Sequence, residues 1–127
     1  MTDRNHSDQP IRWIIAFAGL IGAAGVTAAA AAAHWADERL LGAASAICLA
    51  NAPALLALGF VGARLRLGTL AAVLLILGTA LFAGDVSLRA FSGDGLFSMA
   101  APLGGSTVII AWLLIAVGAL LPPSKRD

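Results

Sequence analysis

Charged residues are scarce in this 127-residue chain: they make up 12% of it, against about a quarter of a typical soluble domain. Hydrophobic residues reach 60%, and the mean hydropathy is +0.91. The formal net charge is only +1, whereas a protein that binds nucleic acid needs a basic face to neutralise phosphates. The composition therefore excludes an ordinary soluble domain and gives no support to nucleic-acid binding.

Residues that carry disulfide, metal or haem chemistry are also few. Cys48 is the only cysteine, so an internal disulfide is impossible, and its apolar surroundings predict a small buried side chain. Of the two histidines, His6 lies in the polar N-terminal segment, which excludes a bis-histidine haem within one chain. His34 is the remaining candidate ligand for a metal, haem iron or a pigment magnesium. The alternative is an interfacial histidine bonded to a loop carbonyl or carboxylate. We expect no cofactor and no metal site.

The sequence has no recognisable catalytic motif. It contains no serine–histidine pair at a known spacing, no GxSxG sequence, no phosphate-binding loop and no pair of intramembrane aspartates. We therefore expect a protein that is not an enzyme.

Long apolar runs take up most of the chain. A helix that crosses the hydrocarbon core needs about 20 mostly apolar residues, because the core is about 30 Å thick and a helix rises about 1.5 Å per residue. The sequence predicts an all-α fold, a bundle of four transmembrane helices, between a polar head at 1–12 and a polar tail at 122–127. The four predicted spans are Trp13–Ala33, Leu40–Ala63, Leu67–Leu88 and Leu103–Leu121.

Basic residues are distributed unequally between the two ends of the predicted bundle. Cytoplasmic flanks of membrane helices carry an excess of lysine and arginine. One end holds six such residues and the other holds Arg39 and Arg89. The six are Arg4, Arg12, Arg64, Arg66, Lys125 and Arg126. We therefore expect a multi-pass protein of the bacterial inner membrane with both termini in the cytoplasm.

Small residues recur within the first two predicted spans. Association between helices in lipid depends on close backbone packing, which small residues permit. We therefore predict that five glycines pack against other helices. Either the bundle packs on itself through them, or a face of small residues receives a partner helix or a flat ligand. The five are Gly19, Gly22, Gly25, Gly59 and Gly62.

Three of the polar residues inside the predicted spans or at their ends are candidate functional residues. Asp85 and Arg89 are four residues apart, so they share a helix face. They form either an interfacial ion pair or a proton- or cation-binding site centred on Asp85. Asn51 should hydrogen-bond another helix, and Pro53 frees a backbone carbonyl nearby that could accept from it.

Several short motifs follow one another along the chain in a recognisable order. They are Ala31–His34, Asn51–Leu56, Leu81–Gly84 and Ala101–Gly105 with Trp112. Their order resembles a family of small bacterial membrane proteins known as domain of unknown function 423 (DUF423), from about Ile11 to Leu121. The resemblance implies a four-helix inner-membrane protein without an established activity. The chain departs from the family pattern at Asn51, where a histidine is typical, and at Asp85, where a serine is typical.

Small-residue faces, short loops and absent catalytic chemistry favour a protein that acts by packing. We expect an accessory or assembly subunit on a larger respiratory or photosynthetic membrane complex. Its partners would be the lipid bilayer and other transmembrane helices, from that complex or from further copies. A second hypothesis is a small oligomeric transporter or ion-conducting protein that uses Asp85 and Asn51. A third is a helper that binds a pigment or quinone through His34.

Overall fold

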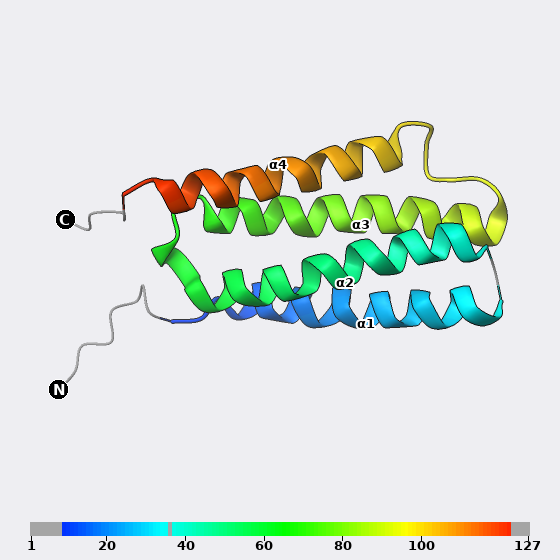
Figure 1. The fold of residues 1–127 in the computed structure, drawn as a ribbon, viewed down its shortest axis with the longest axis horizontal. Coiled ribbons are helices and arrows are strands. Elements are labelled where there is room, and N and C mark those ends of the chain that lie inside the picture. Colours follow the sequence, from blue (N-terminus) through cyan, green and yellow to red (C-terminus); the bar gives the residue numbers. More distant parts are fainter. Residues whose placement is uncertain (1–8, 36, 123–127) are drawn as a thin grey trace.

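The computed structural model describes residues 9–35 and 37–122, and these form four long helices that run up and down beside one another (Figure 1). A short 3-10 turn joins the second helix to the third. All four helices are long and apolar enough to cross a membrane. The predicted four-helix membrane fold is therefore confirmed. The elements are α1 (Arg12–His34), α2 (Glu38–Val61), η2 (Gly62–Arg64), α3 (Gly68–Ser92) and α4 (Ala100–Leu120).

Local chemistry explains where the helices begin and end. The Asp37 side chain accepts hydrogen bonds from the backbone N–H groups of Arg39 and Leu40, at 3.0 and 3.1 Å, and so caps the start of α2. Helix α2 ends before Gly62, whose φ of 64° favours glycine. Helix α3 ends before Gly93, at φ 82°.

The third and fourth helices are placed differently from the prediction. Helix α3 continues to Ser92, four residues beyond the predicted end, and stops at its Gly93 cap. Helix α4 begins at Ala100, so Pro102 lies within its first turn, where the missing N–H does no harm. The loop at 93–99 is correspondingly short.

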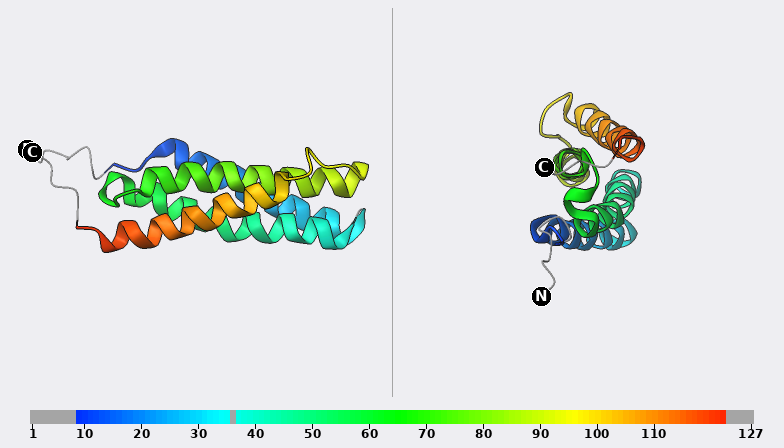
Figure 2. Two further views of the ribbon diagram at one scale, coloured as in Figure 1. Left: turned by 90° about the horizontal axis from the view of Figure 1, so that it is seen from above. Right: turned by 90° about the vertical axis from the view of Figure 1, so that its left-hand side faces the viewer.

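The helices form two hairpins, α1–α2 and α3–α4, which meet mainly along α2 and α3. Viewed along the bundle, α1 and α4 lie far apart on opposite sides of that central pair (Figure 2). The core lies between the hairpins and includes Ile14, Leu55 and Leu75, all 0% exposed. The ends of the described chain lie at the same end of the bundle as the α2–α3 turn (Figure 1).

Large apolar side chains also cover the outside. Leu20, Ile109 and Leu113, for example, are 60% exposed or more. A soluble protein rarely shows so much contiguous apolar surface, but lipid is its natural surrounding. The bundle is a multi-pass membrane protein whose inner contacts are made largely by small residues.

Candidate functional site

Asn51 joins three helices at the centre of the bundle. Its side chain, 1% exposed, donates from Nδ2 to Thr79 Oγ1 of α3 at 2.9 Å. Its Oδ1 accepts from Trp112 Nε1 of α4 at 3.1 Å. The prediction that Asn51 bonds another helix is confirmed, and it bonds two. We call Asn51, Thr79 and Trp112 the polar clamp.

The polar clamp differs from the prediction in its acceptor. Asn51 does not donate to the backbone carbonyl that Pro53 frees, because its amide points to Thr79 on α3 instead. Trp112 lies eight residues before the end of α4, about 12 Å along the helix. Its indole N–H therefore finds its acceptor deep in the span, and the polar clamp links α2 to both α3 and α4.

Asp85 and Arg89 form the predicted ion pair, with Arg89 Nε 2.9 Å from Asp85 Oδ2. The Asp85 side chain is completely buried and also accepts from the backbone N–H of Leu96 at 2.8 Å. Arg89 in turn donates to the Phe97 carbonyl at 3.4 Å. The pair thus holds the α3–α4 loop against α3.

The chain makes room for this loop at Gly95. A Cβ on that residue would collide with Asp85 Oδ1 and lie 2.6 Å from Arg89 Nε. Only glycine fits there without displacing the ion pair. The arrangement gives Asp85 a structural task, since both of its carboxylate oxygens already hold donors from this chain.

His34 stands exposed at the end of α1, beside the ring of Trp35 with centroids 6.4 Å apart. Among residues 9–35 and 37–122, no group of three or more His, Cys, Asp or Glu side chains is arranged to hold a metal ion. Among the described residues, no hydrogen bond or ion pair joins His34 to the polar clamp or to Asp85, so these candidates do not form one bonded site.

Three of the five predicted packing glycines lie where α1 meets α2. A Cβ on Gly25 would come within 2.8 Å of Leu49, and one on Gly59 within 2.6 Å of Ile15. A Cβ on Gly22 would only touch Ala52, at 3.6 Å. The Ser45 hydroxyl also donates to the Gly25 carbonyl at 2.8 Å, which fastens α2 to α1.

The other two predicted packing glycines behave differently. A Cβ on Gly19 would meet nothing within 4 Å, so within the bundle Gly19 does not make the predicted helix contact. The reason is geometric: each step of three residues turns about 60° backwards around a helix, so Gly19 and Gly25 face directions about 120° apart. Gly62 lies just beyond the end of α2, and its positive φ of 64° is a backbone conformation at the helix end that favours glycine.

A close helix crossing between α3 and α4 was not among the predicted packing sites. A Cβ on Gly104 of α4 would lie 2.6 Å from the backbone nitrogen of Phe82 and 2.9 Å from the Gly78 carbonyl. Gly78 faces Gly104 in return, at 2.8 Å. The predicted motif Ala101–Gly105 contains this residue, but its neighbour on α3 can be known only from the fold.

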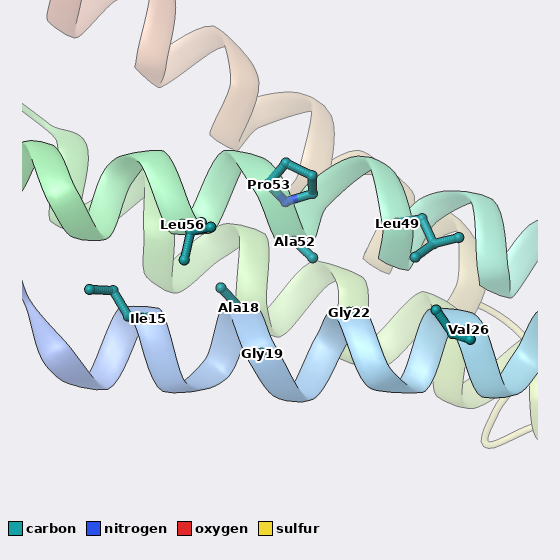
Figure 3. A pocket seen from close by; sticks show the side chains of 9 residues that line it. All are labelled: Ile15, Ala18, Gly19, Gly22, Val26, Leu49, Ala52, Pro53 and Leu56. Atoms are coloured by element: carbon teal, nitrogen blue, oxygen red, sulfur yellow. The ribbon is translucent and has the colours of Figure 1, made fainter.

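An apolar groove of about 530 Å³ runs along the outer face of the α1–α2 hairpin. Figure 3 shows it from close by, with α1 below, α2 above and Gly19 and Gly22 marking the stretch of α1 that lacks side chains. We call this surface the α1–α2 groove. It is lined by Ile15, Ala18, Gly19, Gly22, Val26, Leu49, Ala52, Pro53 and Leu56.

Comparison with known proteins identifies the family. The family model described as "Protein of unknown function (DUF423)" matches residues 17–105, which is more than half of the chain. The chain belongs to the DUF423 family. The matched part of this DUF423 protein includes Asn51 and Thr79, whereas Trp112 lies beyond it. No curated protein and no solved structure matches the chain.

Proposed function

We propose that this DUF423 protein is an accessory or assembly subunit that packs on the transmembrane helices of a larger membrane complex and has no catalytic activity of its own. One observation carries the proposal. Every buried side-chain nitrogen and oxygen of the described residues already has a hydrogen-bond partner, while apolar hollows open outward between the helices. The buried polar side chains therefore bond within the bundle, and the surface available to partner helices is apolar.

The polar groups support this proposal over transport. A transported ion or proton needs polar groups that line a path through the bilayer and can exchange partners. Asp85 and Asn51 lie in different hydrogen-bonded groups, one at the loop end of α3 and one at the centre of the bundle. The α1–α2 groove is lined by apolar and small residues, which suits helix packing.

We further propose that the protein resides in the bacterial inner membrane with both termini in the cytoplasm. The support is the unequal number of arginine and lysine residues. The chain up to the start of α1, the segment between α2 and α3, and the segment after α4 carry six of them, whereas the opposite side has only Arg39 and Arg89. Arg12, Arg64 and Arg66 lie near the α2–α3 turn, at the end where the described chain begins and finishes (Figure 1).

Isolation of the chain from native membranes tests the proposed function. A small affinity tag on the chain, expression at its natural level and a mild detergent would preserve helix contacts. We expect a fixed set of integral membrane proteins in stoichiometric amounts, identified by mass spectrometry. Recovery of the chain without stoichiometric partners, in two mild detergents, would contradict the proposal.

A further inference from the structure

We propose that the turn between α2 and α3 binds the headgroup of an anionic phospholipid through Arg66, with an acyl chain of that lipid lying on the outer face of α3. The proposal goes beyond the accessory role and does not depend on it. It assigns a lipid of stated charge to one place on the bundle.

The first observation is that charge is separated between the two ends of the bundle (Figure 1). In the part of the chain that the structure describes, the end with the α2–α3 turn has three arginines and no acidic residue, whereas the opposite end has two arginines and four acidic residues. The three arginines are Arg12, Arg64 and Arg66, and the four acidic residues are Asp37, Glu38, Asp85 and Asp94.

The full sequence keeps the same sign at the turn end. The chain up to the start of α1, the segment between α2 and α3, and the segment after α4 together hold six basic and three acidic residues. Arginines beside a membrane surface attract anionic lipid headgroups. This end of the bundle is therefore complementary in charge to an anionic membrane surface.

The connection between α2 and α3 places Arg66 at the membrane boundary. Only residues 62–67 join the two helices, and both helices are long and apolar enough to cross a membrane. The Arg66 side chain is exposed and has no hydrogen-bond or ion-pair partner in the described chain. Its positive charge is therefore available to a headgroup.

The backbone at Arg66 is held against α4. A Cβ on Gly118 would collide with the Arg66 carbonyl oxygen, so the two backbones are in contact. The next residue, Leu67, has a φ of 63°, and no other described residue except glycine has a positive φ. Leucine adopts this conformation only where the surrounding packing imposes it. The turn therefore presents Arg66 on a fixed base.

A hollow of about 290 Å³ lies at this turn and has an amphipathic lining. Arg66 contributes a guanidinium, and the exposed Thr69 contributes a hydroxyl that has no partner in the described chain. Three leucines line the same hollow. A phosphate joined to an acyl chain satisfies both kinds of lining residue. The full lining is Ala63, Leu65, Arg66, Leu67, Gly68, Thr69 and Leu70.

The outer face of α3 continues from the hollow toward the middle of the membrane. Leu70 lines the hollow, and Leu77 follows seven residues later on the same helix face. These two side chains are 49% and 58% exposed. Seven residues of helix rise about 10 Å, so an acyl chain attached to the headgroup has an apolar surface to lie on.

This order of groups favours a lipid over an acidic protein segment. The charge lies at the membrane boundary, and the exposed leucines lie directly beyond it on the membrane side. A phospholipid has its charged and apolar parts in the same order. An acidic segment in the water phase would reach Arg66 but would leave Leu70 and Leu77 uncovered.

Lipid retention by the purified full-length chain tests the proposal. The protein in mild detergent is mixed with equal amounts of phosphatidylglycerol and phosphatidylcholine that have the same acyl chains. Native mass spectrometry then measures how much of each lipid stays bound. We expect the parent to retain phosphatidylglycerol in preference. Arg66→Gln should lower that preference about fivefold, as expected for one arginine near an anionic lipid.

Two further variants control this measurement. Arg39→Gln removes an exposed arginine from the opposite end and should leave the preference unchanged. Thr69→Glu places a negative charge in the hollow and should abolish the preference. Because an acidic residue is favourable in the first turn of a helix, Thr69→Glu should unfold in detergent no earlier than the parent.

Each of the other outcomes contradicts the proposal. Equal retention of the two lipids by the parent, or an undiminished preference in both Arg66→Gln and Thr69→Glu, would overturn it. An equal loss in Arg39→Gln would show general charge attraction without a defined site. Displacement of phosphatidylglycerol by millimolar inorganic phosphate would identify a free anion as the ligand. Since the isolated chain is used, failure of the accessory role would leave these results unaffected.

Discussion

Replacing Asn51 by leucine tests whether the polar clamp holds the helices together. Leucine has the branched shape of asparagine and a somewhat larger volume, but it removes the hydrogen bonds to Thr79 and Trp112. It therefore separates the loss of polar contacts from the creation of a cavity. The position is 1% exposed, so neither lipid nor detergent can replace the lost bonds without opening the bundle.

The expected magnitude follows from the two bonds. Interhelical hydrogen bonds in membrane proteins average about 0.6 kcal/mol and reach about 1.7 kcal/mol, so the pair should contribute about 1–3 kcal/mol. Thr79→Val and Trp112→Phe each remove one bond and should each cost about 0.5–1.5 kcal/mol. Thr107→Val is the control, because the exposed Thr107 bonds only its own helix, and it should change stability by less than about 0.5 kcal/mol.

Reversible unfolding in mixed micelles, followed by circular dichroism as denaturing detergent is added, measures these effects. A double-mutant cycle of Asn51→Leu with Thr79→Val should give a coupling energy of about 0.6 kcal/mol or more, because the two residues share one hydrogen bond. An Asn51→Leu protein as stable as the parent, or costs that simply add, would refute the clamp.

Three further predictions follow from the packing, the ion pair and the charge distribution. Gly104→Ala should destabilise the bundle by about 1–3 kcal/mol, because its Cβ would meet the backbone of α3. Gly19→Ala is the control and should change stability by less than about 0.5 kcal/mol, because a Cβ there meets nothing within 4 Å. Equal effects in the same unfolding assay would show that the α3–α4 crossing is misplaced. Liposomes that contain the parent protein and liposomes that contain Asp85→Asn should both show no proton or cation flux above empty liposomes, because Asp85 holds the loop through Leu96 and Arg89. Flux in the parent that disappears in the variant would establish the transporter hypothesis. In a Cys48→Ala background, a thiol reagent that cannot cross the membrane should label Ser92→Cys from outside intact cells but not Ser7→Cys, and the reverse pattern would invert the proposed topology.

Much of the fold could be predicted because hydropathy alone decides it. Four apolar runs of about 20 residues leave few alternatives to four membrane helices. The partnership of Asp85 with Arg89 was equally accessible, since residues four apart share a helix face. Asn51 could be expected to bond another helix because an unsatisfied amide is costly in lipid.

The neighbours of these residues could not be predicted in the same way. Thr79 and Trp112 lie 28 and 61 positions from Asn51, and the hydropathy of a helix does not say which face meets which helix. The same limit applies to Gly104, whose partner backbone belongs to α3. Gly19 does not meet α2 because glycines three apart drift around the helix, so the start of the series lies outside the α1–α2 contact.

The native mass of the chain in mildly solubilised membranes tests the central claim most directly. The parent should migrate far above its own 12.8 kDa, together with other integral membrane proteins. Gly19→Leu, which adds a side chain to the α1–α2 groove at a position where a Cβ would meet nothing within 4 Å, should shift the chain to the mass of the isolated protein, while Ala116→Leu should not. A parent that migrates alone would contradict the accessory role, and a large assembly that Gly19→Leu leaves intact would show that its partners bind elsewhere.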